Sequence, residues 1–498
     1  MVAVERISHW IGGKIVPGES GRTGPVYNPV TGEQTHEVDF ASVEEFDRAV
    51  EIAKEAFPEW RAMPLARRSA LFFRMREVLD QRKTDIAKVI VRQHGKCLFD
   101  ALAEVERGVE LLEFAAGMPH LLKGDYSEQV TTGYDLYSVR QPIGVVAGIT
   151  PFNFPAMVPM WMCAAAMACG NCFILKPSER DPGASIMLAE AFRDAGLPDG
   201  VFQVVQGDKV VVDRILEHPD IRALSFVGST PIAKYVYATA AAHGKKVQAL
   251  AGAKNHMIVL PDADIGMAAD AAVSAVYGSA GERCMAIATV VPVGDIADPL
   301  MEAILERTAK LKVGDGLDPE SEMGPLVTRE HRDRVVSYLD SAREQGATVL
   351  VDGREHPLWG TGFFVGPSII DHVTTDMDCY KDEIFGPVMT VVRVPTYEEA
   401  VGLIQRNRWG NGAAIFTRDG GAARRFVYEV EAGMVGINVP IPVPLAFYSF
   451  GGWKESLFGD SKMYGPEGFH FWTREKAVTV RWPDPATSRV DLGFPSNR

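Results

Sequence analysis

The sequence predicts an α/β protein with a doubly wound parallel sheet and a second α/β unit beside it. Apolar strand segments alternate with amphipathic helix segments from about residue 143 to 438, the order typical of parallel sheets. The uncharged stretch 141–175 is interrupted by prolines, which favours a buried strand, loop and helix over a membrane span. A chain of 498 residues exceeds what one hydrophobic core fills, so two units of about 200 residues fit its length.

Short strands and turns are expected over residues 1–40, followed by four helices. The first helix begins at Ser42-Val-Glu-Glu45, a capping-box pattern in which serine and glutamate each satisfy a backbone N–H. The other three are expected near 65–79, 85–93 and 99–117. A polar hairpin over 124–142 is then expected to project from the body.

The alternating part of the chain falls into two series. In the first, strands are expected at 143–149, 172–175, 201–205, 223–227 and 257–260, with a helix at 181–195. In the second, strands are expected at 287–293, 348–351, 387–394, 413–416 and 434–438, with helices at 299–311, 329–345 and 397–406. A cleft between the two units is the expected ligand site.

Composition excludes several classes of function. A net charge of −14 argues against binding to nucleic acid or to anionic membrane surfaces. Six cysteines are too few for a disulfide scaffold, and the first residues lack the apolar core of a signal peptide, so the cytoplasm is the expected compartment. A nucleotide cofactor stays compatible with this charge, because a helix N-terminus binds phosphate locally.

Two predicted strand ends carry residues suited to a nucleotide. At Leu175-Lys-Pro-Ser-Glu179, lysine suits a phosphate or ribose and glutamate accepts from ribose hydroxyls, although a solvated turn fits equally well. At Phe226-Val-Gly-Ser-Thr230, the first N–H groups of the following helix suit a phosphate, with a plain helix cap as the alternative.

Three further features combine polar groups or cysteines with apolar surroundings. Asn153 either ties its apolar turn together or points into the cleft as an oxyanion donor. Arg107 lies opposite the apolar stripe of its helix and needs an anion, either a neighbouring glutamate, the simpler account, or a ligand. Cys169-Gly-Asn-Cys172 has apolar flanks and no second pair, so core packing is expected there and no metal site.

The segment Gly281-Glu-Arg-Cys284 follows a run of small residues and leads into a strand. A cysteine in this position would lie in a loop, where Gly281 gives the backbone freedom to expose the sulfur. Arg283 could favour the thiolate or hold an anionic substrate. Taken alone, an inert buried cysteine is the commoner case.

Six motifs occurring in order resemble the aldehyde dehydrogenase superfamily, and they cover nearly the whole chain. They are Pro151-Phe-Asn-Phe-Pro155, Leu175-Lys-Pro-Ser-Glu179, Phe226-Val-Gly-Ser-Thr230, Gly281-Glu-Arg-Cys284, Glu383-Ile-Phe-Gly-Pro387 and Phe450-Gly-Gly-Trp-Lys454. The resemblance implies an NAD-binding domain (1–123 and 143–251), a catalytic domain (252–473), and an oligomerisation arm with a C-terminal tail (124–142 and 474–498). It also implies a homo-oligomer, expected to be a tetramer.

The resemblance implies roles for individual residues. Cys284 would be the nucleophile, and Asn153 with the Cys284 backbone N–H would form the oxyanion hole. Phe152 would contact NAD, and Lys176 with Glu179 would hold its adenosine ribose. Ser229 would lie near the pyrophosphate, Glu383 would bind the nicotinamide ribose, and Phe385 would pack near the nicotinamide ring.

One departure from the superfamily pattern concerns the base that activates water in hydrolytic members. Leu250 stands where that glutamate would align. A positioned base contributes about 10²–10⁴-fold to such a step, whereas a thiol is intrinsically nucleophilic. The loss of the base therefore favours transfer of the acyl group to coenzyme A, with a hydrolytic semialdehyde dehydrogenase as the alternative.

Gly252-Ala-Lys-Asn-His256 and Arg283-Cys-Met-Ala286 resemble the acylating methylmalonate-semialdehyde dehydrogenase branch. That resemblance implies that Arg107 and Arg283 bind the carboxylate of a small semialdehyde substrate. Glu282 departs from the glutamine expected there, and a glycine often found near Ala233 is missing, which affects site polarity and pyrophosphate packing. Two other classes are a relative without turnover and a cysteine hydrolase. The first is disfavoured by an intact Cys284, Asn153 and Glu383, and the second by the lack of an identifiable His/Asp arrangement around Cys284.

Overall fold

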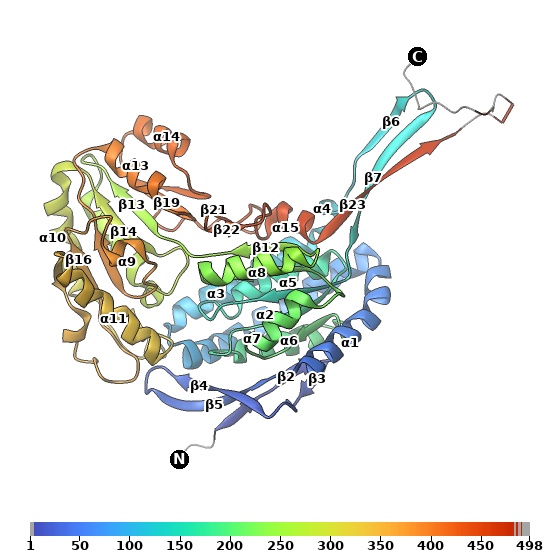
Figure 1. Ribbon diagram of the computed structural model, residues 1–498, viewed down its shortest axis with the longest axis horizontal. Helices are drawn as coiled ribbons and strands as arrows, with labels where there is room; N and C mark the ends of the chain where they lie inside the picture. The colour runs from blue at the N-terminus through green and yellow to red at the C-terminus, as the bar shows by residue number, and fades with distance from the viewer. Residues whose placement is uncertain (1–3, 483–484, 487–489, 491–498) are drawn as a thin grey trace.

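The computed structural model describes residues 4–482, 485–486 and 490. Two α/β bodies lie side by side, and a long β arm projects from one of them (Figure 1). The chain forms most of the first body, then the second, and finally returns to the first. Among the described residues, no helix combines the length and apolar character that a membrane span requires.

The first body is built on an eight-stranded sheet of order β22-β12-β11-β8-β9-β10-β2-β3. Its five central strands are parallel, and antiparallel strands close both edges. The strands β8 and β9 are buried along their whole length, as expected when helices cover both faces. The strands are β2 (His9–Ile11), β3 (Lys14–Val16), β8 (Val145–Ile149), β9 (Cys172–Lys176), β10 (Phe202–Val204), β11 (Ile221–Val227), β12 (Lys246–Leu250) and β22 (Leu457–Phe458).

The helices that precede the crossing at residue 251 belong to the first body and its sheet. They are α1 (Val43–Ala62), α2 (Leu65–His94), α3 (Leu98–Ala116), α4 (Met118–Leu121), α5 (Met157–Ala168), α6 (Gly183–Asp194), α7 (Lys209–Glu217) and α8 (Thr230–Ala242). The prediction of two helices near 65–79 and 85–93 was wrong, because α2 is continuous. The intervening residues 80–84 are polar but include no glycine or proline, so they continue the helix on its solvent side.

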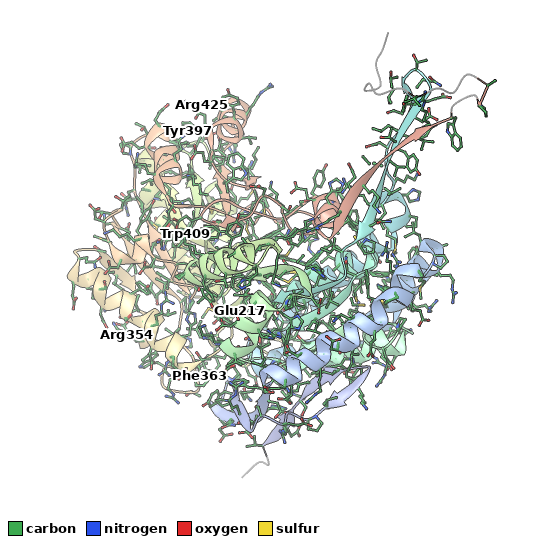
Figure 2. All side chains as sticks on the ribbon, turned by 45° about the vertical axis from the view of Figure 1, so that its right-hand side comes forward. Glu217, Arg354, Phe363, Tyr397, Trp409 and Arg425 are labelled. Atoms are coloured by element: carbon green, nitrogen blue, oxygen red, sulfur yellow. The ribbon has the colours of Figure 1, made fainter. Side chains whose placement is uncertain are left out.

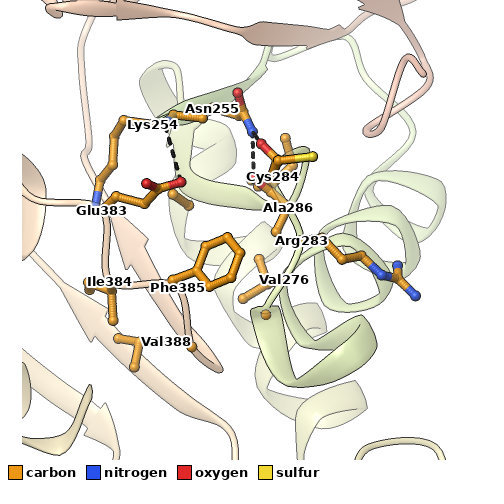
Figure 3. A pocket seen from close by; sticks show the side chains of 15 residues that line it. Lys254, Asn255, Val276, Arg283, Cys284, Ala286, Glu383, Ile384, Phe385 and Val388 are labelled. Carbon is orange, nitrogen blue, oxygen red and sulfur yellow. Dashed lines mark hydrogen bonds between the residues drawn. The ribbon is translucent and has the colours of Figure 1, made fainter. Parts of the chain in front are cut away.

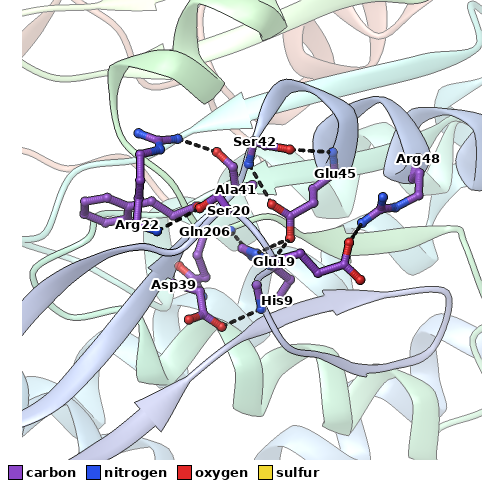
Figure 4. A network of polar contacts seen from close by, with 12 residues as sticks. His9, Glu19, Ser20, Arg22, Asp39, Ala41, Ser42, Glu45, Arg48 and Gln206 are labelled. Carbon is purple, nitrogen blue, oxygen red and sulfur yellow. Dashed lines mark hydrogen bonds and ion pairs between the residues drawn. The ribbon is translucent and has the colours of Figure 1, made fainter.

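A polar network joins the start of α1 to a small sheet formed by β1 (Glu5–Ile7), β4 (Arg22–Asn28) and β5 (Glu33–Phe40) (Figure 4). The predicted capping box is present: Ser42 N donates to Glu45 Oε2 (2.8 Å), and Glu45 N donates to Ser42 Oγ (3.2 Å). Glu45 Oε1 also accepts from Glu19 N (2.7 Å). One buried carboxylate thus caps the helix and ties the N-terminal segment to it.

The second body contains a seven-stranded sheet of order β15-β16-β17-β14-β13-β19-β20, parallel except for the edge strand β15. The chain crosses between the bodies at residues 251–254, between β12 and β13. The strands are β13 (Asn255–Val259), β14 (Ile287–Pro292), β15 (Thr348–Val351), β16 (Ser368–Asp371), β17 (Val388–Val391), β19 (Gly412–Phe416) and β20 (Met434–Ile437), with a separate pair β18 (Trp409–Gly410) and β21 (Trp453–Lys454). The helices are α9 (Ile265–Tyr277), α10 (Ala297–Thr308), α11 (Arg329–Glu344), α12 (Asp378–Lys381), α13 (Tyr397–Arg406) and α14 (Gly420–Glu429), with short 3₁₀ turns η1 (Gly278–Gly281), η2 (Gly294–Ile296) and η3 (Gly353–Glu355).

The arm is a three-stranded antiparallel sheet of order β23-β7-β6. It consists of the hairpin β6 (Tyr126–Thr131) and β7 (Tyr134–Pro142), joined by β23 (Thr473–Arg481) after α15 (Gly465–Phe471). The arm stands away from both bodies in Figure 1. Just before β23, the side chains of Phe450, Phe469 and Trp472 pack into the core of the first body.

Candidate functional site

A cavity of about 500 Å³ lies between the two bodies, at the carboxyl ends of the parallel strands of the first sheet. Among the predicted site residues, its wall includes Phe152, Asn153, Ser229, Cys284, Glu383 and Phe385. Lys176, Glu179, Arg107 and Arg283 lie outside this wall. A smaller cavity of about 30 Å³ adjoins it and shares Cys284, Glu383 and Phe385 (Figure 3). Loops from both bodies therefore meet around Cys284.

The loop that carries Cys284 begins with a left-handed turn. Ser279, Ala280 and Gly281 follow one another with φ of +53°, +51° and +75°. A Cβ on Gly281 would come within 2.2 Å of the Gly386 carbonyl oxygen, so only glycine fits there. Left-handed conformations of non-glycine residues cost about 1–3 kcal/mol each and persist where the surroundings impose them.

Two asparagines form hydrogen bonds with the backbone carbonyls of the Cys284 loop. Asn255 Nδ2 donates to the carbonyls of Cys284 (2.9 Å) and Ala286 (2.9 Å). Asn411 Nδ2 donates to the Cys284 carbonyl as well (3.0 Å). The orientation of Asn255 is fixed because its Oδ1 accepts from Gly412 N (3.0 Å). The sequence contained no separate signal for these contacts.

The Cys284 side chain is partly exposed to the cavity, and its thiol is poorly acidic in this structure. Burial raises the pKa of Cys284 to about 12, and the nearby Glu383 carboxylate adds to the rise. Arg283 lowers this pKa only slightly, since other groups contribute more. The thiolate therefore requires a further positive charge or a base, and Arg283 alone does not supply it.

Asn153 is buried in the loop after β8, and a buried ion pair supports that loop. Lys96 Nζ donates to the Asn153 carbonyl (2.6 Å) and to Glu104 Oε2 (2.9 Å). Glu104 Oε1 accepts from the backbone N–H groups of Ala156 (2.8 Å) and Met157 (3.2 Å), at the start of α5. Both charged side chains are fully buried. This pair fixes the backbone on both sides of Phe154.

Glu383 reaches the cavity from the second body. Its Oε1 accepts from Ala253 N (3.1 Å), and burial raises its pKa to about 7 (Figure 3). Phe385 adopts a left-handed backbone conformation with φ +60° and meets Phe152 edge to face at 5.9 Å between ring centroids. Two aromatic rings from different bodies thus enclose the inner end of the cavity.

Glu282 stands where the family pattern has a glutamine, and its surroundings explain why the difference is small. Glu282 is fully buried between His94 and His331, each 3.7 Å away through Nε2. Among the described residues, its carboxyl accepts only from Val327 N (3.3 Å). Burial raises the pKa of Glu282 well above its usual range. A protonated glutamic acid is neutral and nearly isosteric with the expected glutamine, so the substitution changes little at this position.

The outer wall of the cavity is formed by the first turn of α8. Ser229 is exposed at the N-cap and its side chain makes no capping bond. Thr230 Oγ1 accepts from Gly252 N (3.1 Å) and from Trp409 Nε1 (2.9 Å), so Trp409, labelled in Figure 2, links the two bodies. Pro231 has no N–H, so the N–H groups of Thr230 and Ile232 begin the helix beside the cavity without a capping side chain.

Lys176 and Glu179 pair with each other beside the cavity. Lys176 Nζ donates to Glu179 Oε2 at 2.9 Å. Burial raises the pKa of Glu179, but the Lys176 charge and hydrogen bond outweigh it, so the net effect is a lowered pKa. Glu179 is therefore an ionised acceptor at the carboxyl end of β9.

The two arginines are each paired with an acid of the chain. Arg283 Nη2 lies 2.8 Å from Asp100 Oδ1 on α3, and its side chain extends away from Glu383 in Figure 3. Arg107, also on α3, donates to Glu110 Oε2 (2.8 Å). Burial raises the pKa of Tyr464, with Arg107 opposing and Cys284 adding to the rise, so Tyr464 lies within electrostatic range of both.

Two other predicted positions are apolar in their surroundings. Leu250 ends β12 as a buried side chain, and its carbonyl accepts from Gly228 N (3.1 Å). Cys169 and Cys172 are buried in the core of the first body, where burial raises both thiol pKa values. Neither position offers ionisable chemistry at the site.

Comparisons with known proteins agree with this geometry. The aldehyde dehydrogenase family model matches residues 15–478. The chain is 52% identical to a malonate-semialdehyde dehydrogenase of Pseudomonas aeruginosa (98% of this chain, 99% of that protein) and 48% identical to malonate-semialdehyde dehydrogenase 2 of Geobacillus kaustophilus (96% and 99%).

Solved structures are similar over the same length. A Sinorhizobium meliloti protein assigned as a methylmalonate-semialdehyde dehydrogenase, solved in complex with NAD, has a TM-score of 0.96 at 51% identity (98% of this chain, 100% of that one). The methylmalonate-semialdehyde dehydrogenase of Oceanimonas doudoroffii has a TM-score of 0.95 at 51% identity (97% and 99%). The fold predicted from the sequence is confirmed, and the chain belongs to the aldehyde dehydrogenase family.

Proposed function

We propose that this chain is an NAD-dependent, CoA-acylating dehydrogenase of malonate or methylmalonate semialdehyde. The observation that carries the proposal is the pairing of Cys284 with Asn153 on one cavity wall, while Leu250 stands where a water-activating base would align. The names of the similar proteins, malonate- and methylmalonate-semialdehyde dehydrogenases, support the substrate class.

In the first half of the reaction, Cys284 is the nucleophile. The Cys284 thiol gives up its proton to solvent, the thiolate attacks the aldehyde carbon, and the carbonyl electron pair moves to oxygen. The Asn153 amide and the Cys284 backbone N–H hold that oxyanion. NAD, when bound, supplies the acceptor for the hydride that leaves this carbon. Cys284 then carries the acyl group as a thioester.

The residues around the cavity fit NAD. Ser229 and the first N–H groups of α8 suit the pyrophosphate, and the ionised Glu179 with Lys176 suits the adenosine ribose. At the inner end, Glu383 suits the hydroxyls of the nicotinamide ribose, and Phe152 and Phe385 enclose a planar ring.

The second half moves the acyl group off Cys284. The thioester carbonyl lies β to the substrate carboxylate, so it takes up the electron pair released when carbon dioxide departs, and the resulting carbanion is protonated. The thiol of coenzyme A then attacks the thioester, its proton passes to the leaving Cys284 thiolate, and propionyl- or acetyl-CoA is released.

We assign the substrate carboxylate to Arg107 and Arg283. The observations in support are that Arg107 lies on α3, that Arg283 pairs with Asp100 of the same helix, and that Tyr464 is in electrostatic range of both Arg107 and Cys284. Each guanidinium already pairs with an acid of the chain, so the substrate carboxylate would take the place of that acid. Replacing both arginines by alanine should raise KM for carboxylated aldehydes far more than KM for propanal, and equal effects on the two would refute this role.

The proposal is tested by measuring NADH formation from methylmalonate semialdehyde with and without coenzyme A, and by identifying the product. Sustained turnover requires coenzyme A and yields propionyl-CoA if the proposal holds. Steady turnover without coenzyme A, with a free carboxylic acid as product, would establish the hydrolytic alternative instead. A thiol-labelling assay at Cys284, with protection by substrate, separates both from a relative without turnover.

We also propose that the arm assembles the chain into a homotetramer. The hairpin carries the apolar side chains Tyr126, Val130 and Leu136, which are 37–63% exposed in the single chain. Light scattering during size-exclusion chromatography should give a mass near four times 54.4 kDa. Deleting residues 127–136 should yield smaller species.

A further inference from the structure

A second cavity of about 520 Å³ lies beside the first, in the second body. It is bounded by α12, by the C-terminal end of α13, and by the segment that leads into β18. The two cavities share Asp382 and Arg408 in their walls. Glu383, which follows Asp382, lines the main cavity with Cys284, so the second cavity adjoins the reaction site on the side of Glu383.

The second cavity is positively charged, in a chain whose net charge is −14. Lys381, Arg406 and Arg408 line it, and within the described residues none of them forms an ion pair with a carboxylate; Lys381 donates only to the Asp376 carbonyl (2.5 Å). The acidic lining residue, Asp382, is occupied by the Tyr338 hydroxyl (3.0 Å).

Other arginines of the second body do have carboxylate partners. Arg354 and Arg425, labelled in Figure 2, each pair with two carboxylates of the chain. Arg408 instead lies over the Trp409 ring, with its guanidinium carbon 4.0 Å from the ring centroid. Stacking fixes the plane of a guanidinium and leaves its N–H donors free for a planar or tetrahedral anion.

The chemistry of these donors suits phosphate. Arginine binds phosphate through paired N–H donors and lysine as a point charge, and an accumulation of unpaired cations in one cavity attracts polyanions. The pyrophosphate of NAD is already assigned to the first turn of α8, and Arg408 lies near that turn, because Trp409 beneath it donates to Thr230 Oγ1 (2.9 Å). Lys381 and Arg406 line the second cavity and not the main one, so these two cations are suited to a different phosphate-bearing ligand that also reaches Cys284.

We propose that the cavity lined by Lys381, Arg406 and Arg408 binds the phosphate groups of coenzyme A, with the thiol arm passing Arg408 into the main cavity. This inference rests on the proposed function, which requires a thiol acceptor at Cys284. It assigns recognition of the acceptor to residues that take no part in the oxidation step.

The test uses the double variant Lys381→Ala/Arg406→Ala, since neither residue lines the main cavity. Each phosphate-binding side chain that is removed should raise KM for coenzyme A about tenfold or more, because a hydrogen bond to a charged group contributes about 1.5–3 kcal/mol. KM for pantetheine, which has the thiol arm but no phosphate, should not change. The burst of NADH formed without coenzyme A should also be unchanged.

The control is Lys310→Ala/Arg425→Ala, which removes the same charge from exposed positions elsewhere in the second body and should leave all three quantities unchanged. Equal effects on coenzyme A and pantetheine, or a raised KM for NAD, would overturn the assignment. Calorimetric titration of coenzyme A without aldehyde separates the two proposals. If coenzyme A binds the double variant more weakly, but the wild type forms NADH steadily without coenzyme A, the binding site is supported and the acylating function is refuted. Unchanged binding with CoA-dependent turnover refutes the site alone.

Discussion

Replacing Lys96 by methionine should destabilise the protein and slow catalysis together. The ammonium group of Lys96 is fully buried and bridges Glu104 to the carbonyl of Asn153. Its loss leaves the Glu104 carboxylate buried without a counter-charge, which costs about 3–5 kcal/mol. It also leaves the Asn153 carbonyl without its donor, which costs a further 1–3 kcal/mol or so unless water enters.

The expected loss of stability depends on pH. Burial already raises the pKa of Glu104 even with Lys96 beside it, so without Lys96 the carboxyl takes up a proton more readily. A folded-state pKa raised above the unfolded value means that stability is lost as pH rises. Lys96→Met should therefore be least destabilised near pH 5 and most destabilised above pH 8, as measured by urea unfolding.

The matching kinetic measurement is kcat with saturating NAD and coenzyme A. Removing an oxyanion donor outright costs about 10²–10³-fold in kcat, so displacement of the Asn153 loop should cost at least about tenfold. The double variant Lys96→Met/Glu104→Gln removes both charges and should regain most of the stability, but not the rate, because the Asn153 carbonyl still lacks a donor.

The control for this prediction is the exposed pair of Lys83 with Glu106, which joins α2 to α3 at 3.0 Å. Removing Lys83 should cost less than about 1 kcal/mol and leave kcat unchanged, as is usual for surface ion pairs. A loss below 1 kcal/mol for Lys96→Met, or a normal kcat in the double variant, would refute the reasoning.

Four further predictions concern single side chains. The rate of Cys284 alkylation without ligands should keep rising beyond pH 9, because burial raises the thiol pKa to about 12, and a plateau near pH 8.5 would contradict this. Asp100→Asn should release Arg283 and lower KM for carboxylated aldehydes but not for propanal, whereas a raised KM would mean that Asp100 orients the arginine. KM for NAD should fall as pH rises through about 7, where Glu383 ionises and becomes a better acceptor, and Glu383→Gln should abolish that dependence. Glu282→Gln should change the unfolding free energy little near pH 4.5 and increase it at pH 8, because only the unfolded wild type ionises this buried group; equal curves would show that Glu282 is charged when folded.

The sequence predicted the fold well wherever a local pattern has a local cause. The capping box at Ser42 forms within four residues, so its signature appears intact in the structure. The buried strands β8 and β9 are apolar throughout because both of their faces are covered. The split of α2 was predicted wrongly because a polar run was taken for a break, although only glycine or proline interrupts a helix strongly.

The site was predictable at strand ends and unpredictable where distant segments meet. Asn153, Ser229 and Cys284 follow strands or precede them in motifs, and all three reach one cavity. Asn255 and Asn411 both bind the Cys284 carbonyl from positions 156 residues apart, and no spacing rule connects them. Contacts of this kind depend on how the sheets pack, which the linear pattern does not encode.

The pairing of Arg283 with Asp100 is also a contact between distant segments that the sequence does not reveal. An arginine was expected to need an anion, and both arginines have one. The partner of Arg107 lies three residues away on its own helix and could be anticipated, whereas the partner of Arg283 lies on α3, in the other body. The sequence therefore indicated the need for a charge but not its source.

The contact between Gly281 and Gly386 joins two turns that contain left-handed residues. One turn leads to Cys284, and the other follows Phe385, itself left-handed. Because backbone meets backbone there, no side chain can flex to absorb a displacement. The spacing between the Cys284 loop and the Phe385 loop is therefore set by main-chain atoms alone, and a side chain added at Gly281 would force the two loops apart.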